Sequence, residues 1–183
     1  MGAGVLVAGK NGNGEVVVLV GRRPQEPGLK EVNDIVGRFN LVFDDCWTNP
    51  FGTMDSLDNG NFRNCAVREL VEEILEGDGK KRSAKELEPH FNHWAGLAIG
   101  SGLIRQVENS RESLMAIPFV GEFRTYFASV GKPVEQLGNP KPNLEFVPGT
   151  VGWQKPSWLV GQPRVHLGLR QSLEFFTTEL ARL

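Results

Sequence analysis

Cysteine and long hydrophobic runs are both scarce in this sequence. Only two cysteines, Cys46 and Cys65, occur in 183 residues, and no Cys-x-x-Cys pair is present. This disfavours a disulfide scaffold and a structural zinc site, and a reducing, cytoplasmic compartment is expected. No apolar run approaches the roughly 20 residues of a membrane-spanning helix, so no membrane partner is expected.

Charge of one sign is not in excess either. Lysine and arginine total 20 against 22 aspartate and glutamate residues, which gives a formal net charge of -2. No global positive field therefore favours nucleic acid or an anionic membrane surface. The length and the hydrophobic fraction of 40% fit one globular domain over residues 1–183, with a core of its own.

Several catalytic signatures are missing as well. The chain has no Gly-x-Ser-x-Gly segment for a serine nucleophile and no phosphate-binding P-loop. Its three histidines, His90, His93 and His166, form no ligand set, because Pro89 argues against the regular helix that would align the first two. The residues that remain as candidates for chemistry are mainly carboxylates.

Turn signals and hydrophobic periodicity predict an α/β fold. Val5–Ala8 and Glu15–Val20 are apolar runs around a glycine-rich turn, which predicts an opening β-hairpin covered on both faces. Leu167–Leu183 has the spacing of an amphipathic helix. Other expected elements are strands at 35–36, 39–43, 99–107 and 113–123, a short helix at 83–90, a helical turn at 134–137 and a loop at 139–163. This order predicts a mixed sheet with helices packed on it.

The clearest helix is Asn61–Glu76, which ends before Gly77 and has two contrasting faces. At about 100° per residue, one face is apolar and the other gathers four carboxylates, namely Glu69, Glu72, Glu73 and Glu76. Like-charge neighbours repel by about 0.2–0.5 kcal/mol per pair. Bound Mg²⁺ would relieve that repulsion and suits metal-assisted attack of water on a phosphoanhydride. A solvated surface face is the alternative, and on charge pattern alone it is the commoner case.

The segment Arg68-Glu69-Leu70-Val71-Glu72-Glu73 resembles the Arg-Glu-aliphatic-x-Glu-Glu core of the Nudix box. Phe51-Gly52-Thr53 and the turn Asp58–Asn61 resemble the segments before that core, and the opening hairpin resembles the start of a Nudix domain. The similarity covers roughly the first 80 residues. It implies an α/β/α sandwich with a mixed sheet flanked by helices. It also implies a hydrolase that uses Mg²⁺ or Mn²⁺ to cleave a phosphoanhydride bond in a nucleoside-diphosphate-linked substrate.

The resemblance also implies roles for single residues. Glu72 and Glu73 would be metal ligands, and Glu69 would be a ligand or the base that activates water. Arg68 would orient Glu69 through a salt bridge, since a forked guanidinium suits a carboxylate. Glu76 lies outside the motif as an outer helper. Backbone at two glycines would approach the phosphates closely, namely Gly52 and Gly60.

Residues outside the motif offer further candidates, each with an ordinary alternative. Arg22 and Arg23 end the second strand, where they contact phosphate or simply solvate the surface. A further carboxylate would come from Glu108, Glu112 or Glu122, with Glu112 best placed, although ordinary surface positions are favoured for all three. Two tryptophans would stack on a nucleobase or, more commonly, anchor the loop in the core, namely Trp153 and Trp158.

The sequence departs from the Nudix pattern before and within the helix. Ile74 replaces the usual glycine, and the turn is longer than usual. The upstream glutamate is absent, with Gly60 in its place at the strict spacing or Asn61 if the turn is aligned by its glycine. These departures keep a second hypothesis open, a catalytically weak or inactive Nudix-fold module that binds nucleotide, RNA or protein. The expected partner is a small nucleotide substrate, and an RNA cap and a homodimer stay open.

Overall fold

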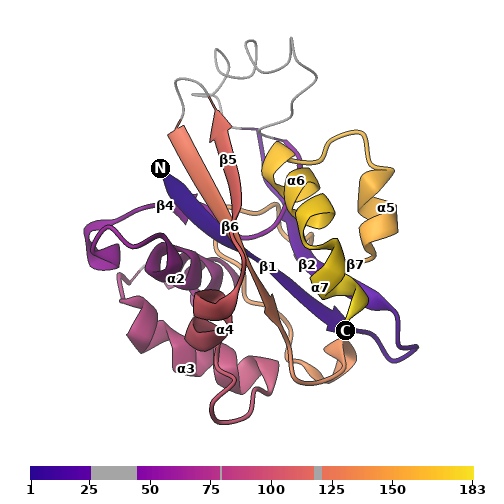
Figure 1. The fold of residues 1–183 in the computed structure, drawn as a ribbon, viewed down its shortest axis with the longest axis horizontal. Coiled ribbons are helices and arrows are strands. Elements are labelled where there is room, and N and C mark those ends of the chain that lie inside the picture. The colour runs from indigo at the N-terminus through magenta and orange to yellow at the C-terminus, as the bar shows by residue number, and fades with distance from the viewer. Residues whose placement is uncertain (26–44, 79, 118–120) are drawn as a thin grey trace.

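A mixed β-sheet organises residues 1–25, 45–78, 80–117 and 121–183, the residues that the computed structural model describes (Figure 1). Its main path has the order β3-β2-β1-β6-β5, while β4 pairs with β1 and β7 pairs with β2. The strands are β1 (Gly2–Lys10), β2 (Val16–Arg22), β3 (Trp47–Thr48), β4 (Phe51–Thr53), β5 (Ser113–Ile117), β6 (Gly121–Ser129) and β7 (Gly152–Gln154).

Strand β1 is the centre of the sheet. It runs antiparallel to β2, with Ala8 opposite Val18, and parallel to β6, from Gly2 opposite Phe123 to Ala8 opposite Ser129. The other pairs, including β5 with β6, are antiparallel. The expected mixed sheet and its opening hairpin are therefore confirmed.

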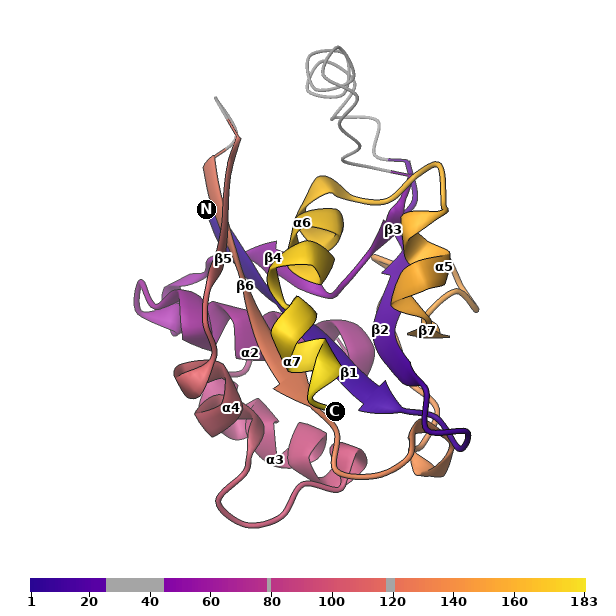
Figure 2. The same cartoon turned by 45° about the vertical axis from the view of Figure 1, so that its right-hand side comes forward.

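Helices cover both faces of this sheet (Figures 1 and 2). Side chains that alternate along β1 enter two separate cores, with Val5 and Val7 on one face and Leu6 and Ala8 on the other. The first core includes residues of α2 (Phe62–Ile74), α3 (Ala84–Ala95) and α4 (Leu103–Asn109). The second includes residues of α5 (Pro156–Val160), α6 (Leu167–Phe175) and α7 (Thr177–Ala181). The chain is an α/β/α sandwich, as expected.

Helix α2 is the expected acidic helix, and its start is fixed locally. The side chain of Asn61 caps it by accepting from the backbone N–H groups of Arg63 and Asn64. Its apolar face is fully buried against the first core, and Leu70 and Val71 have no exposed surface. Packing of that face on β1 and β4 leaves the carboxylates along one side of the helix.

Two expected elements are wrong in type or extent. Residues 99–107 were expected to be a strand, but α4 begins at Leu103, where Leu103 and Val107 point into the core one helical turn apart. The single strand expected at 113–123 is a hairpin of β5 and β6, whose second strand continues to Ser129.

The other expectations are partly confirmed. The helix at 83–90 is α3, which continues to Ala95 with Pro89 inside it, so the expectation that Pro89 prevents a regular helix at His90 and His93 is wrong. The turn at 134–137 is a 3₁₀ turn over Val134–Gln136. The loop at 139–163 contains β7 and α5, and the last helix divides at Phe176. Strands expected at 35–36 and 39–43 lie outside the described residues. Within those residues no helix has the length and apolarity to cross a membrane.

Candidate functional site

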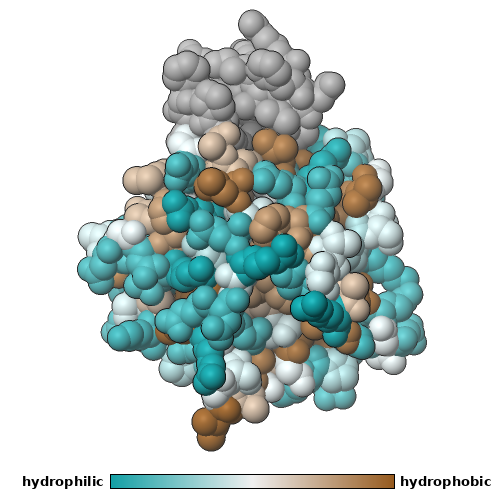
Figure 3. Space-filling model, in the orientation of Figure 1, coloured by the Kyte–Doolittle hydropathy of each residue, from teal (hydrophilic) through white to brown (hydrophobic). Residues whose placement is uncertain are grey.

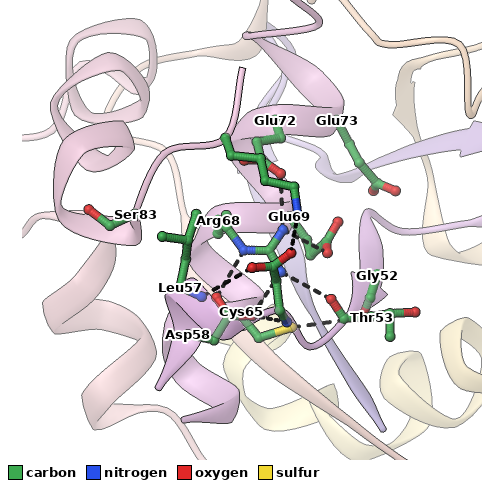
Figure 4. A network of polar contacts seen from close by, with 12 residues as sticks. Gly52, Thr53, Leu57, Asp58, Cys65, Arg68, Glu69, Glu72, Glu73 and Ser83 are labelled. Atoms are coloured by element: carbon green, nitrogen blue, oxygen red, sulfur yellow. Dashed lines mark hydrogen bonds and ion pairs between the residues drawn. The ribbon is translucent and has the colours of Figure 1, made fainter. Parts of the chain in front are cut away.

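The Arg68 guanidinium lies in a buried ion-pair network beneath α2 (Figure 4). Its Nε and one terminal nitrogen donate to the two carboxylate oxygens of Asp58 over 2.9 and 2.8 Å. The same terminal nitrogen donates to the carbonyl oxygen of Thr53 over 3.0 Å. The other terminal nitrogen lies 2.9 Å from Glu69 and 3.0 Å from Glu72. Because every arm of the guanidinium has an acceptor, Arg68 orients Glu69 and Glu72 together.

Strand β4 touches two carboxylates of α2. The backbone N–H of Phe51 donates to Glu73 Oε2 over 2.9 Å. Beside it, Gly52 leaves the space that the Glu69 carboxylate fills, since a Cβ at position 52 would lie 2.1 Å from Glu69 Oε2. Gly52 was expected to let the backbone approach a phosphate. In the structure, the absence of a side chain at Gly52 instead makes room for the Glu69 carboxylate.

A second guanidinium, that of Arg23, connects α2 to a later part of the chain. One terminal nitrogen lies 2.7 Å from Glu73 Oε1 and 3.0 Å from Glu145 Oε2. It also donates to the carbonyl oxygen of Phe51, whose ring lies 4.3 Å from the guanidinium carbon. A backbone bond from Asn143 N–H to the carbonyl oxygen of Glu73 brings the loop with Glu145 to this position.

Burial controls the protonation of the two inner glutamates. Desolvation raises the pKa of Glu69 to about 7, Arg68 opposes that rise, and the charges of Glu145 and Glu72 add to it. Glu73 is fully buried, and burial raises its pKa well above the usual range although Arg23 opposes the shift. Both carboxylates ionise more readily when another positive charge comes close.

A pocket of about 420 Å³ lies beside the C-terminal end of α2. Glu72 and Glu76 lie on its wall, and the far side is lined by Lys80, Lys81, Asn143, Leu144 and Glu145. Glu76 was expected in the helix, but α2 ends at Ile74, and Glu76 in the following segment pairs with Arg82 over 3.0 Å and contacts His90 of α3. The pocket joins the charged side of α2 to solvent.

The structure brings together Arg68, Glu69, Glu72 and Glu73, but it does not gather the three glutamates around one point. Among the described residues, no three His, Cys, Asp or Glu side chains form a ready metal site. The physical reason is that two guanidinium groups divide the carboxylates. Arg68 holds Glu69 and Glu72, whereas Arg23 holds Glu73.

The upstream acid that the sequence pattern left out is present as Asp58, which is 1% exposed in its side chain and paired with Arg68. Asp55 and Asp58 have the spacing of a capping box, and both reciprocal bonds form. That spacing was a signal for the turn at 56–58. The pairing with Arg68 depends on the path of the chain, which no local pattern indicates.

The additional carboxylate beside α2 is Glu145, which sequence reasoning also missed. The favoured candidate, Glu112, instead pairs with Arg124 over 3.0 Å and accepts from the Tyr126 hydroxyl over 2.7 Å. Glu122 also pairs with Arg124, and Glu108 lies on the exposed side of α4. Glu145 lies in the stretch expected to be a long loop, 139–163, and no sequence motif marks it.

The remaining candidates have structural contacts. Arg22 pairs with Asp45 over 2.9 Å, and Gly60 adopts a left-handed φ of 70° in the turn before α2. Trp153 packs against the first core beside Trp94, with ring planes 8° apart. Trp158 is 40% exposed and meets Trp47 edge to face.

The donor chemistry of the site fits a hard divalent cation. Its side-chain acceptors are carboxylate oxygens only, which are the ligands that Mg²⁺ and Mn²⁺ prefer. Two of these carboxylates, Glu69 and Glu73, are buried and have raised pKa values. A bound cation would lower those pKa values and favour the ionised carboxylates.

The fold is that of Nudix hydrolases. RenU, a Nudix hydrolase from M. smegmatis, superposes with a TM-score of 0.57 at 18% identity over 100% of this chain and 86% of that one. An Ap4A hydrolase from C. elegans gives a TM-score of 0.56 at 14% identity, over 100% of both chains. The Nudix domain of Shewanella oneidensis NrtR, solved with ADP ribose, gives 0.55 at 14% identity, over 98% of this chain and 86% of that one. Neither a protein-family model nor a curated protein sequence matches the chain.

Proposed function

We propose that this protein is a hydrolase that uses Mg²⁺ or Mn²⁺ to cleave a phosphoanhydride bond in a nucleoside-diphosphate-linked substrate. The observation that carries the proposal is the placement of Glu69, Glu72 and Glu73 on one side of α2, with Arg68 locked against Asp58. A purely solvated acidic face has no need of a buried arginine that holds two of its glutamates. The Nudix fold supports the same assignment.

The proposed site contains residues with three roles, namely a general base, metal ligands and a positioning residue. Glu69 has a pKa of about 7, raised by burial, which suits a base that takes a proton from water near neutral pH. Glu72, Glu73 and Glu145 would hold the cation, and Arg68 keeps Glu69 and Glu72 in position. A bound cation would neutralise negative charge on the phosphate oxygens.

The pocket beside α2 supports an anionic substrate of nucleotide size. Its volume of about 420 Å³ lies in the range of small-molecule sites. Lys80 and Lys81 line it with side chains 75 and 76% exposed, and they pair with Asp78 over 3.9 Å and with Asp55 over 2.6 Å. Ammonium groups there would contact phosphates of the substrate while the cation neutralises the acidic side.

The similar structures support a nucleotide as the substrate class, since one is an Ap4A hydrolase and another was solved with ADP ribose. We also propose a cytoplasmic location, because Cys46 and Cys65 are buried and form no disulfide. Activity on an RNA cap and assembly into a homodimer both stay predictions.

A panel of nucleoside-diphosphate derivatives, including ADP ribose and Ap4A, tests this function with Mg²⁺ and with Mn²⁺. We expect release of phosphate or a nucleoside monophosphate from at least one compound. Glu69→Gln should slow that release by about 10²- to 10⁴-fold, the range for a lost general base. Glu73→Gln should do the same or more, whereas Glu174→Gln, on the exposed side of α6, should match the wild type. Wild-type rates in both site variants would overturn the proposal.

A second candidate, a nucleotide-binding module without turnover, is favoured by one observation. Arg68 and Arg23 already hold the carboxylates in pairs, and no described set of three acids is arranged for a metal. Calorimetry separates the two functions. Nucleotide binding that is independent of Mg²⁺, with no hydrolysis across the panel, would support the module and contradict the enzyme.

A further inference from the structure

A second charged pocket lies between α4, β6 and α7, on the helical surface away from β4. Its volume is about 460 Å³, and three arginines line it, namely Arg105, Arg111 and Arg182. None of the residues that line it belongs to the acidic site on α2. The space-filling view shows hydrophilic side chains gathered over α4 and α7 on this face (Figure 3).

Positive charge in this pocket is not balanced from within. Its single acid is Glu179, which accepts two bonds of 2.7 Å from Arg111. The Phe175 ring lies 4.6 Å from the same guanidinium and helps to fix it. Arg105 and Arg182 form no ion pair with any residue that the structure describes. Three arginines therefore share one carboxylate in this pocket: Glu179 pairs with Arg111 and lies near enough to Arg182 for its pKa to be lowered by that charge, in a chain whose net charge is -2.

Two uncharged polar side chains of the pocket, Gln106 and Ser110, are already satisfied. The Gln106 amide donates to the carbonyl oxygens of Ser101 and Ser129, and its oxygen accepts from Ser129 N–H. The Ser110 hydroxyl donates to the carbonyl oxygen of Arg111 and accepts from the backbone N–H of Phe127. The charged groups that the pocket still offers a ligand are the donors of Arg105 and Arg182, so an acceptor-rich anion is the complementary chemistry.

We infer that this pocket binds a small phosphorylated anion, independently of metal and of the acidic site. Forked guanidinium groups match phosphate oxygens, and the volume suits a small molecule. A single concave pocket in a chain of net negative charge fits a small anion better than a nucleic-acid backbone, which needs an extended basic surface. On its other side Arg105 borders a depression with Glu88 and Glu108, and it pairs with neither of them.

Calorimetric titration of the whole protein with inorganic pyrophosphate, in EDTA without divalent metal, tests the inference. We expect saturable binding that weakens as salt concentration rises. The double variant Arg105→Gln/Arg182→Gln should bind at least about tenfold more weakly, a loss of about 1.4 kcal/mol. The matched control is Arg170→Gln, an exposed arginine on α6 that has no ion pair within the described ranges, and it should bind as the wild type does.

The acidic-site variant Glu73→Gln separates this inference from the proposed function. It should lose hydrolysis and keep pyrophosphate binding, so either idea can fail alone. Absence of saturable binding, or equal binding by the double variant and the wild type, would overturn the inference. Tighter binding of single-stranded RNA than of pyrophosphate, lost in the same double variant, would overturn the assignment to a small anion.

Discussion

Replacing Asp58 with asparagine removes the partner that holds Arg68 in the protein interior. The carboxylate accepts from Nε and a terminal nitrogen of Arg68 and from the backbone N–H of Asp55 over 2.7 Å. An asparagine of the same shape has one acceptor oxygen, and its amide hydrogens face the donors of the guanidinium. The variant leaves a buried cation with fewer acceptors.

The size of the effect follows from the burial of the pair. Removing one partner of a buried ion pair costs about 3–5 kcal/mol, because the remaining charge stays desolvated. Arg68 keeps Glu69, Glu72 and the carbonyl oxygen of Thr53 as acceptors, and the asparagine fills the same space. We therefore expect the lower end, a loss of about 3 kcal/mol in the free energy of unfolding.

Urea unfolding followed by tryptophan fluorescence measures this loss, with an unchanged slope showing that only stability differs. Asp78→Asn is the matched control, because Asp78 pairs with Arg82 at the surface and should contribute little. A loss for Asp58→Asn no larger than for the control would refute the idea that this buried pair fixes Arg68.

Three further outcomes follow from the same geometry. Gly52→Ala should displace the Glu69 carboxylate and lower hydrolysis with folding retained, whereas Gly12→Ala in the exposed hairpin should leave rates unchanged. Calorimetric titration with Mn²⁺ should show about tenfold weaker binding for Glu145→Gln, as for other lost supporting groups. Burial lowers the pKa of His166 to about 3, so the unfolded chain takes up the proton first as pH falls through its own pKa of about 6.5. Between pH 7 and pH 5, urea unfolding should therefore show a loss of stability that is about 2 kcal/mol larger in the wild type than in His166→Asn, because the raised pKa values of Glu69 and Glu73 act in the opposite direction in both proteins.

The sequence was sufficient to predict secondary structure where the local hydrophobic pattern agrees with the burial of the residues. The hairpin of β1 and β2 and the helix α2 were predicted because their apolar residues match the period of one element and their turns carry glycine or asparagine caps. The segment of α4 was misread because its apolar residues, Leu103, Ile104 and Val107, are too few to separate a strand from one helical face.

The site was predictable only along α2. Residues in one helix keep their spacing in space, so the side shared by Glu69, Glu72 and Glu73 follows from the sequence. Asp58 and Glu145 reach Arg68 and Arg23 from separate loops, and their approach depends on how the chain packs around β4. The division of the carboxylates between two guanidinium groups is likewise a tertiary property.

The most direct measurement of the central claim is the rate of hydrolysis as a function of Mg²⁺ concentration, for the best substrate of the panel. We expect no turnover in EDTA, saturable recovery when Mg²⁺ is added, and a loss of about 10²-fold or more in Glu69→Gln at saturating metal. Hydrolysis that persists in EDTA, or that Glu69→Gln leaves unchanged at every metal concentration, would contradict the assignment of this chemistry to the carboxylates of α2.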